Sequence, residues 1–126
     1  MFFSQQEINE IPFEMQSEFF KDGNGKARLS LVTRVQIHEL PFRKEADRSC
    51  DQLNVVSGIF DRNGTMIEGQ EKVIELRLRD RTLDQLRAIA VKASFAVDLG
   101  HYMLRVVVRD TEGKQLSAKS ATIEIP

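Results

Sequence analysis

Hydrophobic and polar residues alternate with a period of two along much of the chain. The clearest run gives one apolar face with an internal threonine and one polar face: Leu29, Leu31, Thr33, Val35 and Ile37 against Arg28, Ser30, Arg34 and Gln36. A period of two places successive side chains on opposite faces of a β-strand. The pattern therefore predicts an antiparallel sheet with one buried face.

Seven strands are predicted, and turn-forming residues separate several of them. Their apolar positions lie at Phe13–Phe19, Leu29–Ile37, Leu53–Phe60, Ile74–Leu78, Val91–Leu99, Tyr102–Asp110 and Ala121–Ile125. Glycine-containing turns are expected at residues 21–26, 61–64 and 111–114, where the turn can match the twist of the flanking strands. The strand at Leu53–Phe60 is apolar on both faces, which favours a central position in its sheet.

One short helix interrupts the strands. Thr82 and Gln85 have the spacing of a capping box, in which the two side chains satisfy free backbone N–H groups. Leu83, Leu86 and Ile89 fall on one face of this helix, and we expect them to cover an end of the core.

These elements predict an all-β fold. Parallel α/β folds need a helix after nearly every strand, whereas short strands separated by turns are typical of sandwiches. We expect a seven-stranded Greek-key sandwich of immunoglobulin or fibronectin-III type, with the helix between strands four and five. Residues 1–11 are interpreted as an irregular lead-in and residues 12–126 as the domain. The charged segment His38–Ser49 is expected to cross between the sheets.

The run from Asp98 to Tyr102 is interpreted as a corner between two strands. Gly100 can make the turn, and Tyr102 begins a buried strand. The hydroxyl of a tyrosine in this place can donate a hydrogen bond backwards along the chain and fix the corner of a sandwich. Asp98, Gly100 and Tyr102 are therefore predicted to be structural residues, and a ligand contact by Tyr102 is the weaker alternative.

Composition and charge describe one ordinary globular domain. The chain has 126 residues and a formal net charge of −1. Nucleic-acid binding needs a concentrated basic face, but acidic residues interleave the densest basic stretch, Arg77–Arg81. We expect no nucleic-acid partner. Cys50 is the only cysteine, so no disulfide can form within the chain, and its predicted role is packing.

No export or membrane signal is expected within these residues. Met1-Phe2-Phe3 is apolar but has no basic residues before it and is followed at once by polar residues. No stretch approaches the roughly 20 apolar residues that a membrane helix needs. The chain itself thus predicts neither a signal peptide nor insertion into a membrane.

Candidate catalytic and metal-binding residues are few. His38 and His101 are the only histidines, and their spacing supports no metal site. Glu68, Glu71 and Glu75 could supply acids for glycoside hydrolysis, but nothing in the sequence places them at a cleft. Nucleophile elbows, phosphate loops and dinucleotide motifs are absent from the sequence. We expect no enzyme activity and no cofactor.

Several phenylalanines are candidates for a contact surface. Phe20 points away from the core in the predicted strand, because Phe19 occupies the inward position. Phe2 and Phe3 have no obvious place in the core. A cluster of exposed aromatic side chains would mark contact with a neighbouring domain or another protein.

The segment from Leu53 to Pro126 resembles the C-terminal region of bacterial "VWFA-related Acidobacterial domain" proteins. The earlier stretches Ile11–Phe13 and Leu40–Lys44 are similar to the same region. The chain departs from the family pattern before the corner glycine, where Asp98-Leu99 replaces the usual proline or prolines. The matching motifs are Phe60–Gly64, Gln70–Lys72, Glu75–Leu78, Leu99–Tyr102, Arg105–Asp110 and Ile123–Pro126.

The resemblance implies a non-catalytic companion of a von Willebrand factor A domain in an exported protein, either extracellular or in the cell envelope. Such a neighbour would bind a divalent cation through an Asp-x-Ser-x-Ser loop, and this chain contains no such motif. The expected function is an interaction or spacer module whose partner is a neighbouring domain or another protein. The alternative is a carbohydrate-binding accessory module, although a chain without tryptophan and with one tyrosine offers few rings for sugar stacking.

Overall fold

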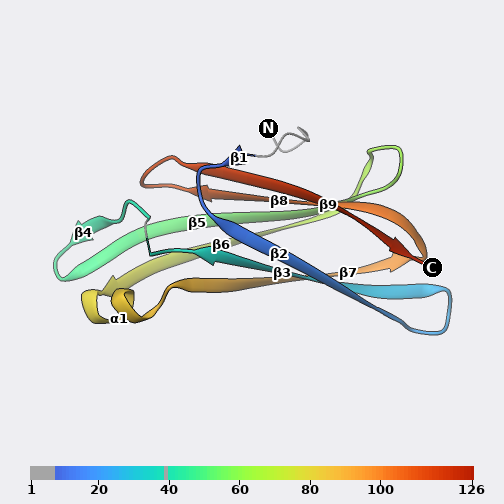
Figure 1. Cartoon of the computed structure of the whole chain (residues 1–126), viewed down its shortest axis with the longest axis horizontal. Helices are drawn as coiled ribbons and strands as arrows, with labels where there is room; N and C mark the ends of the chain where they lie inside the picture. The colour runs from blue at the N-terminus through green and yellow to red at the C-terminus, as the bar shows by residue number, and fades with distance from the viewer. Residues whose placement is uncertain (1–7, 39) are drawn as a thin grey trace.

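The computed structural model describes residues 8–38 and 40–126 and consists almost entirely of antiparallel strands (Figure 1). The strands are β1 (Ile8–Asn9), β2 (Phe13–Lys21), β3 (Lys26–Gln36), β4 (Arg43–Glu45), β5 (Arg48–Phe60), β6 (Met66–Arg79), β7 (Ala88–Asp98), β8 (Gly100–Asp110) and β9 (Leu116–Ile125), and the helix is α1 (Asp80–Gln85).

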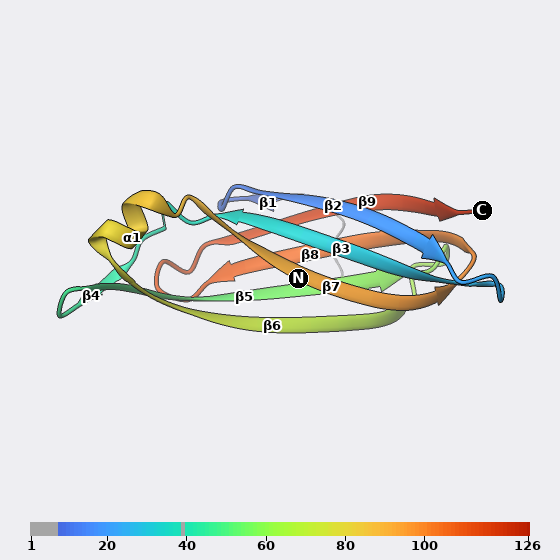
Figure 2. The same ribbon diagram turned by 90° about the horizontal axis from the view of Figure 1, so that it is seen from below.

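The strands form two sheets that lie one over the other (Figure 2). The larger sheet has six strands in the order β1-β9-β8-β5-β4, and β6 also pairs with β5. The smaller sheet has the order β2-β3-β7. Strand β5 is central because β6 and β8 pair along the same stretch of it, as its apolar residues on both faces predict.

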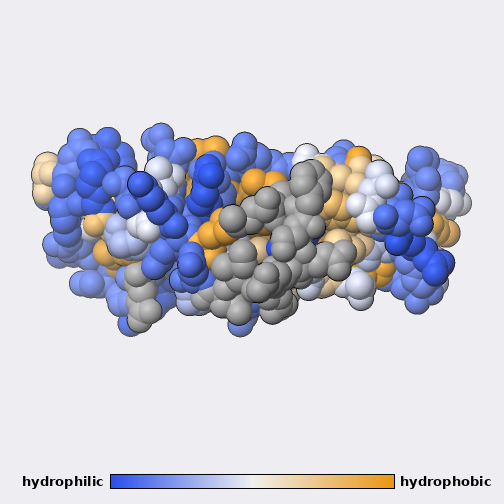
Figure 3. Space-filling model, turned by 90° about the horizontal axis from the view of Figure 1, so that it is seen from above, coloured by the Kyte–Doolittle hydropathy of each residue, from blue (hydrophilic) through white to orange (hydrophobic). Residues whose placement is uncertain are grey.

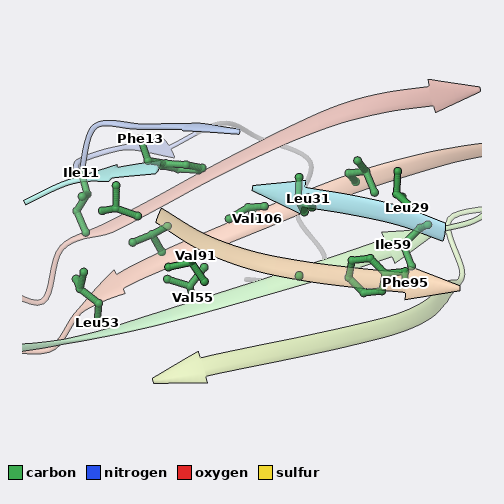
Figure 4. Close-up of a cluster of buried hydrophobic side chains, with 14 of the residues drawn as sticks. Ile11, Phe13, Leu29, Leu31, Leu53, Val55, Ile59, Val91, Phe95 and Val106 are labelled. Atoms are coloured by element: carbon green, nitrogen blue, oxygen red, sulfur yellow. The ribbon is translucent and has the colours of Figure 1, made fainter. Parts of the chain in front are cut away.

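The core fills the space between the two sheets. Alternate residues of β3 and β7 meet alternate residues of β5 and β8, and Leu31, Phe95, Val55 and Val106 are each at most 1% exposed (Figure 4). The alternation of apolar and polar residues in the sequence follows from this packing, because only one face of each strand faces the core between the sheets. The sequence prediction of a β-sandwich is confirmed at this level.

Side chains close both edges of the sandwich by bonding to backbone atoms of the opposite sheet. At one edge, Gln70 of β6 donates to the carbonyl of Ser94 at 2.6 Å, and Lys72 donates to the carbonyl of Lys92. At the other edge, Lys119 of β9 donates to the carbonyl of Phe13 at 2.7 Å. Ser117 also exchanges hydrogen bonds with the backbone of Ile11, in both directions.

The number of strands differs from the prediction of seven. Short strands β1 and β4, of two and three residues, accompany the seven long ones in the described part of the chain. Strand β4 forms a hairpin with β5 in which Ala46 has a φ of 56°. Neither strand is long enough to show alternation, so the hydrophobic pattern could not predict them.

The start of the sandwich lies further toward the N-terminus than the interpreted boundary at residue 12. Strand β1 pairs with β9 through Ile8 and Asn9. Ile11 is 1% exposed and belongs to the core. Residues 8–11 are therefore part of the packed structure, while residues 1–7 of the predicted lead-in lie outside the described residues.

Two local predictions are wrong. The helix lies between β6 and β7 as expected, but Arg79 occupies the cap position and no side chain caps the helix. Thr82 lies inside the helix, where its carbonyl accepts a hydrogen bond from the N–H of Leu86 at 2.8 Å. Leu99 was assigned to the inward face, yet it is 40% exposed because it forms the link between β7 and β8.

Replacing Phe95 by alanine should lower the free energy of unfolding by about 3–5 kcal/mol, because it leaves a cavity between the sheets. Chemical denaturation of the two proteins measures this difference. Val73→Ala is the matched control: Val73 is 51% exposed, so its loss should change stability by no more than about 0.5 kcal/mol. Equal effects of the two substitutions would contradict the described core.

Candidate interaction surface

The histidines and acidic residues considered for chemistry do not gather into one site. His38 lines a cavity with Arg87 and Gln115, whereas His101 lines a different one with Asp61 and Tyr102. The His101 Nε2 atom lies 3.5 Å from Glu124 Oε1 at the surface. Within residues 8–38 and 40–126, no group of three or more His, Cys, Asp or Glu side chains could hold a metal ion.

The corner between β7 and β8 joins the two sheets. The Tyr102 hydroxyl donates a hydrogen bond of 2.6 Å to the carbonyl of Asp98, four residues earlier. Burial, followed by the nearby Asp98 carboxylate, raises the pKa of Tyr102 above its ordinary value. Gly100 has a φ of +151°, which strains any residue with a side chain. This arrangement makes Tyr102 part of the connection between the sheets.

The outer face of the six-stranded sheet carries apolar residues that the core does not use. The register places Val56 beside Val107 and Glu71, and it places Asn54 beside Val73 and Arg109. All of these positions lie on the face opposite the core residues Leu53 and Val55, because neighbours along a strand point to opposite sides. Figure 3 shows the molecule from this side, with apolar surface between hydrophilic groups.

A groove runs across this outer face. It has a volume of about 600 Å³, and both apolar and charged side chains line it. We call it the outer groove and define it by its lining residues Glu10, Asn54, Val56, Glu71, Val107, Arg109, Lys114 and Leu116. Val73 adjoins Asn54 at its border and is 51% exposed. A surface that combines apolar side chains with charges of both signs is typical of protein–protein contacts.

The phenylalanines proposed as a contact surface lie elsewhere or cannot be placed. Phe20 is 61% exposed and pairs with Arg28 on the outer face of the three-stranded sheet. It therefore lies on the opposite side of the sandwich from the outer groove. Phe2 and Phe3 lie outside the described residues.

Sequence analysis did not predict the outer groove. Its lining includes Val56 of β5 and Val107 of β8, which are far apart in the sequence and become neighbours only through strand pairing. One signal was present: β5 and β8 are apolar on both faces, although a sandwich core needs only one. The second face was interpreted as a mark of a central strand, and it also supplies the groove.

Comparisons with known proteins show the fold. No family model matches the chain, and no curated protein sequence does. A β-glucuronidase from Bacteroides uniformis matches 88% of the chain at a TM-score of 0.61 and 14% identity. A member of glycosyl hydrolase family 2 from Bacteroides cellulosilyticus matches 93% of it at 0.61 and 16% identity. A Bordetella pertussis protein described as ApaA matches 92% at 0.58 and 5% identity.

The chain spans only a small part of the two glycosidases, 13% and 16% of their lengths, but 94% of the Bordetella protein. At these identities the likeness establishes an antiparallel β-sandwich and nothing about activity. Among the described residues, no helix is long and apolar enough to cross a membrane.

Replacing Tyr102 by phenylalanine should lower the free energy of unfolding by about 0.5–1.5 kcal/mol, since it removes one hydrogen bond and keeps the ring. Chemical denaturation measures the loss. The control is Thr122→Val, which also lies at this end of β8–β9 but is exposed. If Tyr102→Phe is as stable as the wild type, the bond to Asp98 does not hold the corner.

Proposed function

We propose that the chain is a non-catalytic interaction or spacer module that packs against a neighbouring domain through the outer groove. The observation that carries this proposal is an apolar sheet face, separate from the core, at which Val73 remains 51% exposed. Val56 and Leu116 of the adjoining groove are partly exposed, and contiguous apolar surface marks contact sites more often than isolated exposed residues do.

The small share of the glycosidase chains that this fold covers supports the same function. In those enzymes a region of this fold makes up less than a fifth of a long chain. A sandwich of this size that accompanies other domains needs a surface for them, and the outer groove provides one. Its lining includes Glu10 and Glu71 together with Arg109 and Lys114, so a partner with charges of both signs would fit it.

We also propose a specific sandwich topology and a specific neighbouring domain. We assign the order β2-β3-β7 over β6-β5-β8-β9 to a Greek-key arrangement of immunoglobulin or fibronectin-III type, in which a tyrosine begins the strand after the corner. From the sequence resemblance, the neighbour would be a von Willebrand factor A domain of an exported bacterial protein.

A carbohydrate-binding module is the second candidate. The likeness to parts of glycosidases favours it, but among the described residues that line the outer groove none is aromatic and could stack on a sugar ring. The first surface to test for this function is the cavity beside Tyr102, which has a volume of about 450 Å³ and includes Arg62 and His101.

The test uses the complete natural polypeptide. Residues 1–126 and the remainder of that polypeptide are produced separately, and calorimetry measures their binding. Val73→Lys should weaken binding at least about tenfold, because it places a charge in a desolvated apolar contact. Phe20→Ser is the matched control on the opposite face and should leave the affinity within about threefold.

Two results would overturn this proposal. One is a complete natural polypeptide with no further domain, or no binding between the two parts. The other is weakening by Phe20→Ser with no effect of Val73→Lys, which would place the contact on the three-stranded sheet. A glycan array that binds the wild-type chain, with loss of binding in Tyr102→Phe or Arg62→Ala, would favour the carbohydrate candidate instead.

A further inference from the structure

Two aspartates lie side by side in the interior at one end of the sandwich. Asp51 near the start of β5 is 5% exposed, and Asp110 at the end of β8 is fully buried. Their strand partners are the core residues Leu76 and Leu53, so both carboxyl groups point to the inner side of the sheet. Buried carboxyl groups are rare in proteins unless they are paired or hydrogen-bonded.

The two carboxyl groups converge on the turn between β8 and β9. The N–H of Glu112 lies 3.2 Å from Asp51 Oδ1 and 3.1 Å from Asp110 Oδ1. Asp110 Oδ2 accepts a 3.0 Å bond from the N–H of Gly113, and Asp51 Oδ1 also accepts a 2.7 Å bond from the N–H of Gln52. Asp51 Oδ2 is buried and accepts no backbone or cationic hydrogen bond from the described residues.

Two adjacent buried carboxylates repel each other, and a shared proton removes the repulsion. Burial, followed by the hydrogen bond with Asp110, raises the pKa of Asp51 to about 7, although the N–H groups of Glu112 and Gln52 oppose the shift. Asp51 therefore takes up a proton within the physiological range, beside the buried Asp110.

The charged groups around the pair do not neutralise it. Arg43 of β4 and Arg77 and Glu75 of β6 border the opening beside Asp51, together with Cys50 of β5 and Glu112 of the turn. Arg43 is engaged by Glu112 at 3.1 Å and by Glu45. Among the described residues, no ion pair includes Asp51 or Asp110. Three of the four carboxyl oxygens accept hydrogen bonds from backbone N–H groups, and none of the four is paired with a cation among the described residues.

The pair holds a turn that packs tightly on the segment entering β4. The N–H of Thr111 donates to the carbonyl of Gln52 at 3.0 Å. A side chain at Gly113 would overlap the ring of Pro41 and the carboxylate of Asp110. The bonds to Glu112 and Gly113 thus fix the turn against the end of the sandwich, and the same turn carries Lys114 of the outer groove.

We propose that Asp51 and Asp110 form a proton-operated latch on the β8–β9 turn, closed when the pair shares a proton and loosened when both acids are ionised. Protonation strengthens the hold because the Asp51–Asp110 hydrogen bond then replaces a repulsion between two buried charges. Because the turn carries Lys114, opening of the latch would also move a lining residue of the outer groove. That consequence for binding rests on the proposed function, whereas the latch itself does not.

The sign of the pH effect follows from the raised pKa. The folded state holds the proton up to about pH 7, whereas the unfolded state releases it near pH 3.8. The extra stability is fully present below the lower value and is lost as the pH rises through the higher one. Protection of the Glu112 and Gly113 amides from hydrogen exchange should therefore fall between about pH 4 and 7 and change little above that range.

The experiment compares amide exchange in the wild type and in Asp51→Asn, which keeps the shape and the accepted bonds but cannot ionise. At pH 8.5 both amides should exchange about tenfold faster in the wild type than in the variant. This ratio is smaller than the largest change in stability that the shifted pKa of one proton allows. At pH 4, where the stabilisation of the wild type is nearly complete, the two proteins should agree within about threefold. Asp84→Asn, an exposed aspartate of α1, is the matched control and should behave like the wild type at both values.

If Asp51→Asn does not fold, the proposal can still be tested on the wild-type protein by following its carboxyl carbons by NMR as the pH changes. This experiment should show that the Asp51 carboxyl group titrates with a midpoint near pH 7. If Asp51 titrates below about pH 5, or if the two amides stay equally protected in the wild type and the variant at pH 8.5, the latch does not exist. Neither measurement uses a partner, so failure of the proposed function leaves this result unchanged.

Discussion

The structure depends on the mutual burial of two sheet faces. Each sheet has one face of large apolar residues, and the free energy of removing that face from water holds the layers together, at roughly 25 cal/mol per Å² of apolar surface. The side chains of Gln70, Lys72 and Lys119 then tie the sheet edges to one another. Because the corner at Tyr102 links β7 of one sheet directly to β8 of the other, their relative position is fixed by a short connection.

Only one face of β5 contributes to the core, so its outer face is available for contact with a partner. Leu53, Val55 and Ile59 fill the interior, while Val56 and its neighbour Val107 line the outer groove. The polar interior at the end of the sandwich has a different character, since Asp51 and Asp110 replace apolar residues where the β8–β9 turn needs hydrogen-bond acceptors. The same strands thus supply packing, a surface and a buried acidic pair.

The sequence predicted those features that depend on nearest neighbours along one strand. Alternation in Leu29–Ile37 identified a strand with one buried face because period and burial have the same geometric cause. The predicted capping box was wrong because Thr82 lies inside α1, whose cap position is occupied by Arg79 without a side-chain hydrogen bond. The outer groove and the Asp51–Asp110 pair were missed for another reason: their residues are more than 50 positions apart, and only the register of β5 with β8 brings them together.

The central claim is that the outer groove is covered by a partner in the assembled protein. Hydroxyl-radical labelling of side chains, in the complete natural polypeptide and in residues 1–126 alone, tests it most directly. The account predicts that labelling of Val73 and Leu116 drops severalfold in the complete protein, while labelling of Phe20 on the opposite face stays the same. Equal labelling of Val73 and Leu116 in both proteins would contradict it.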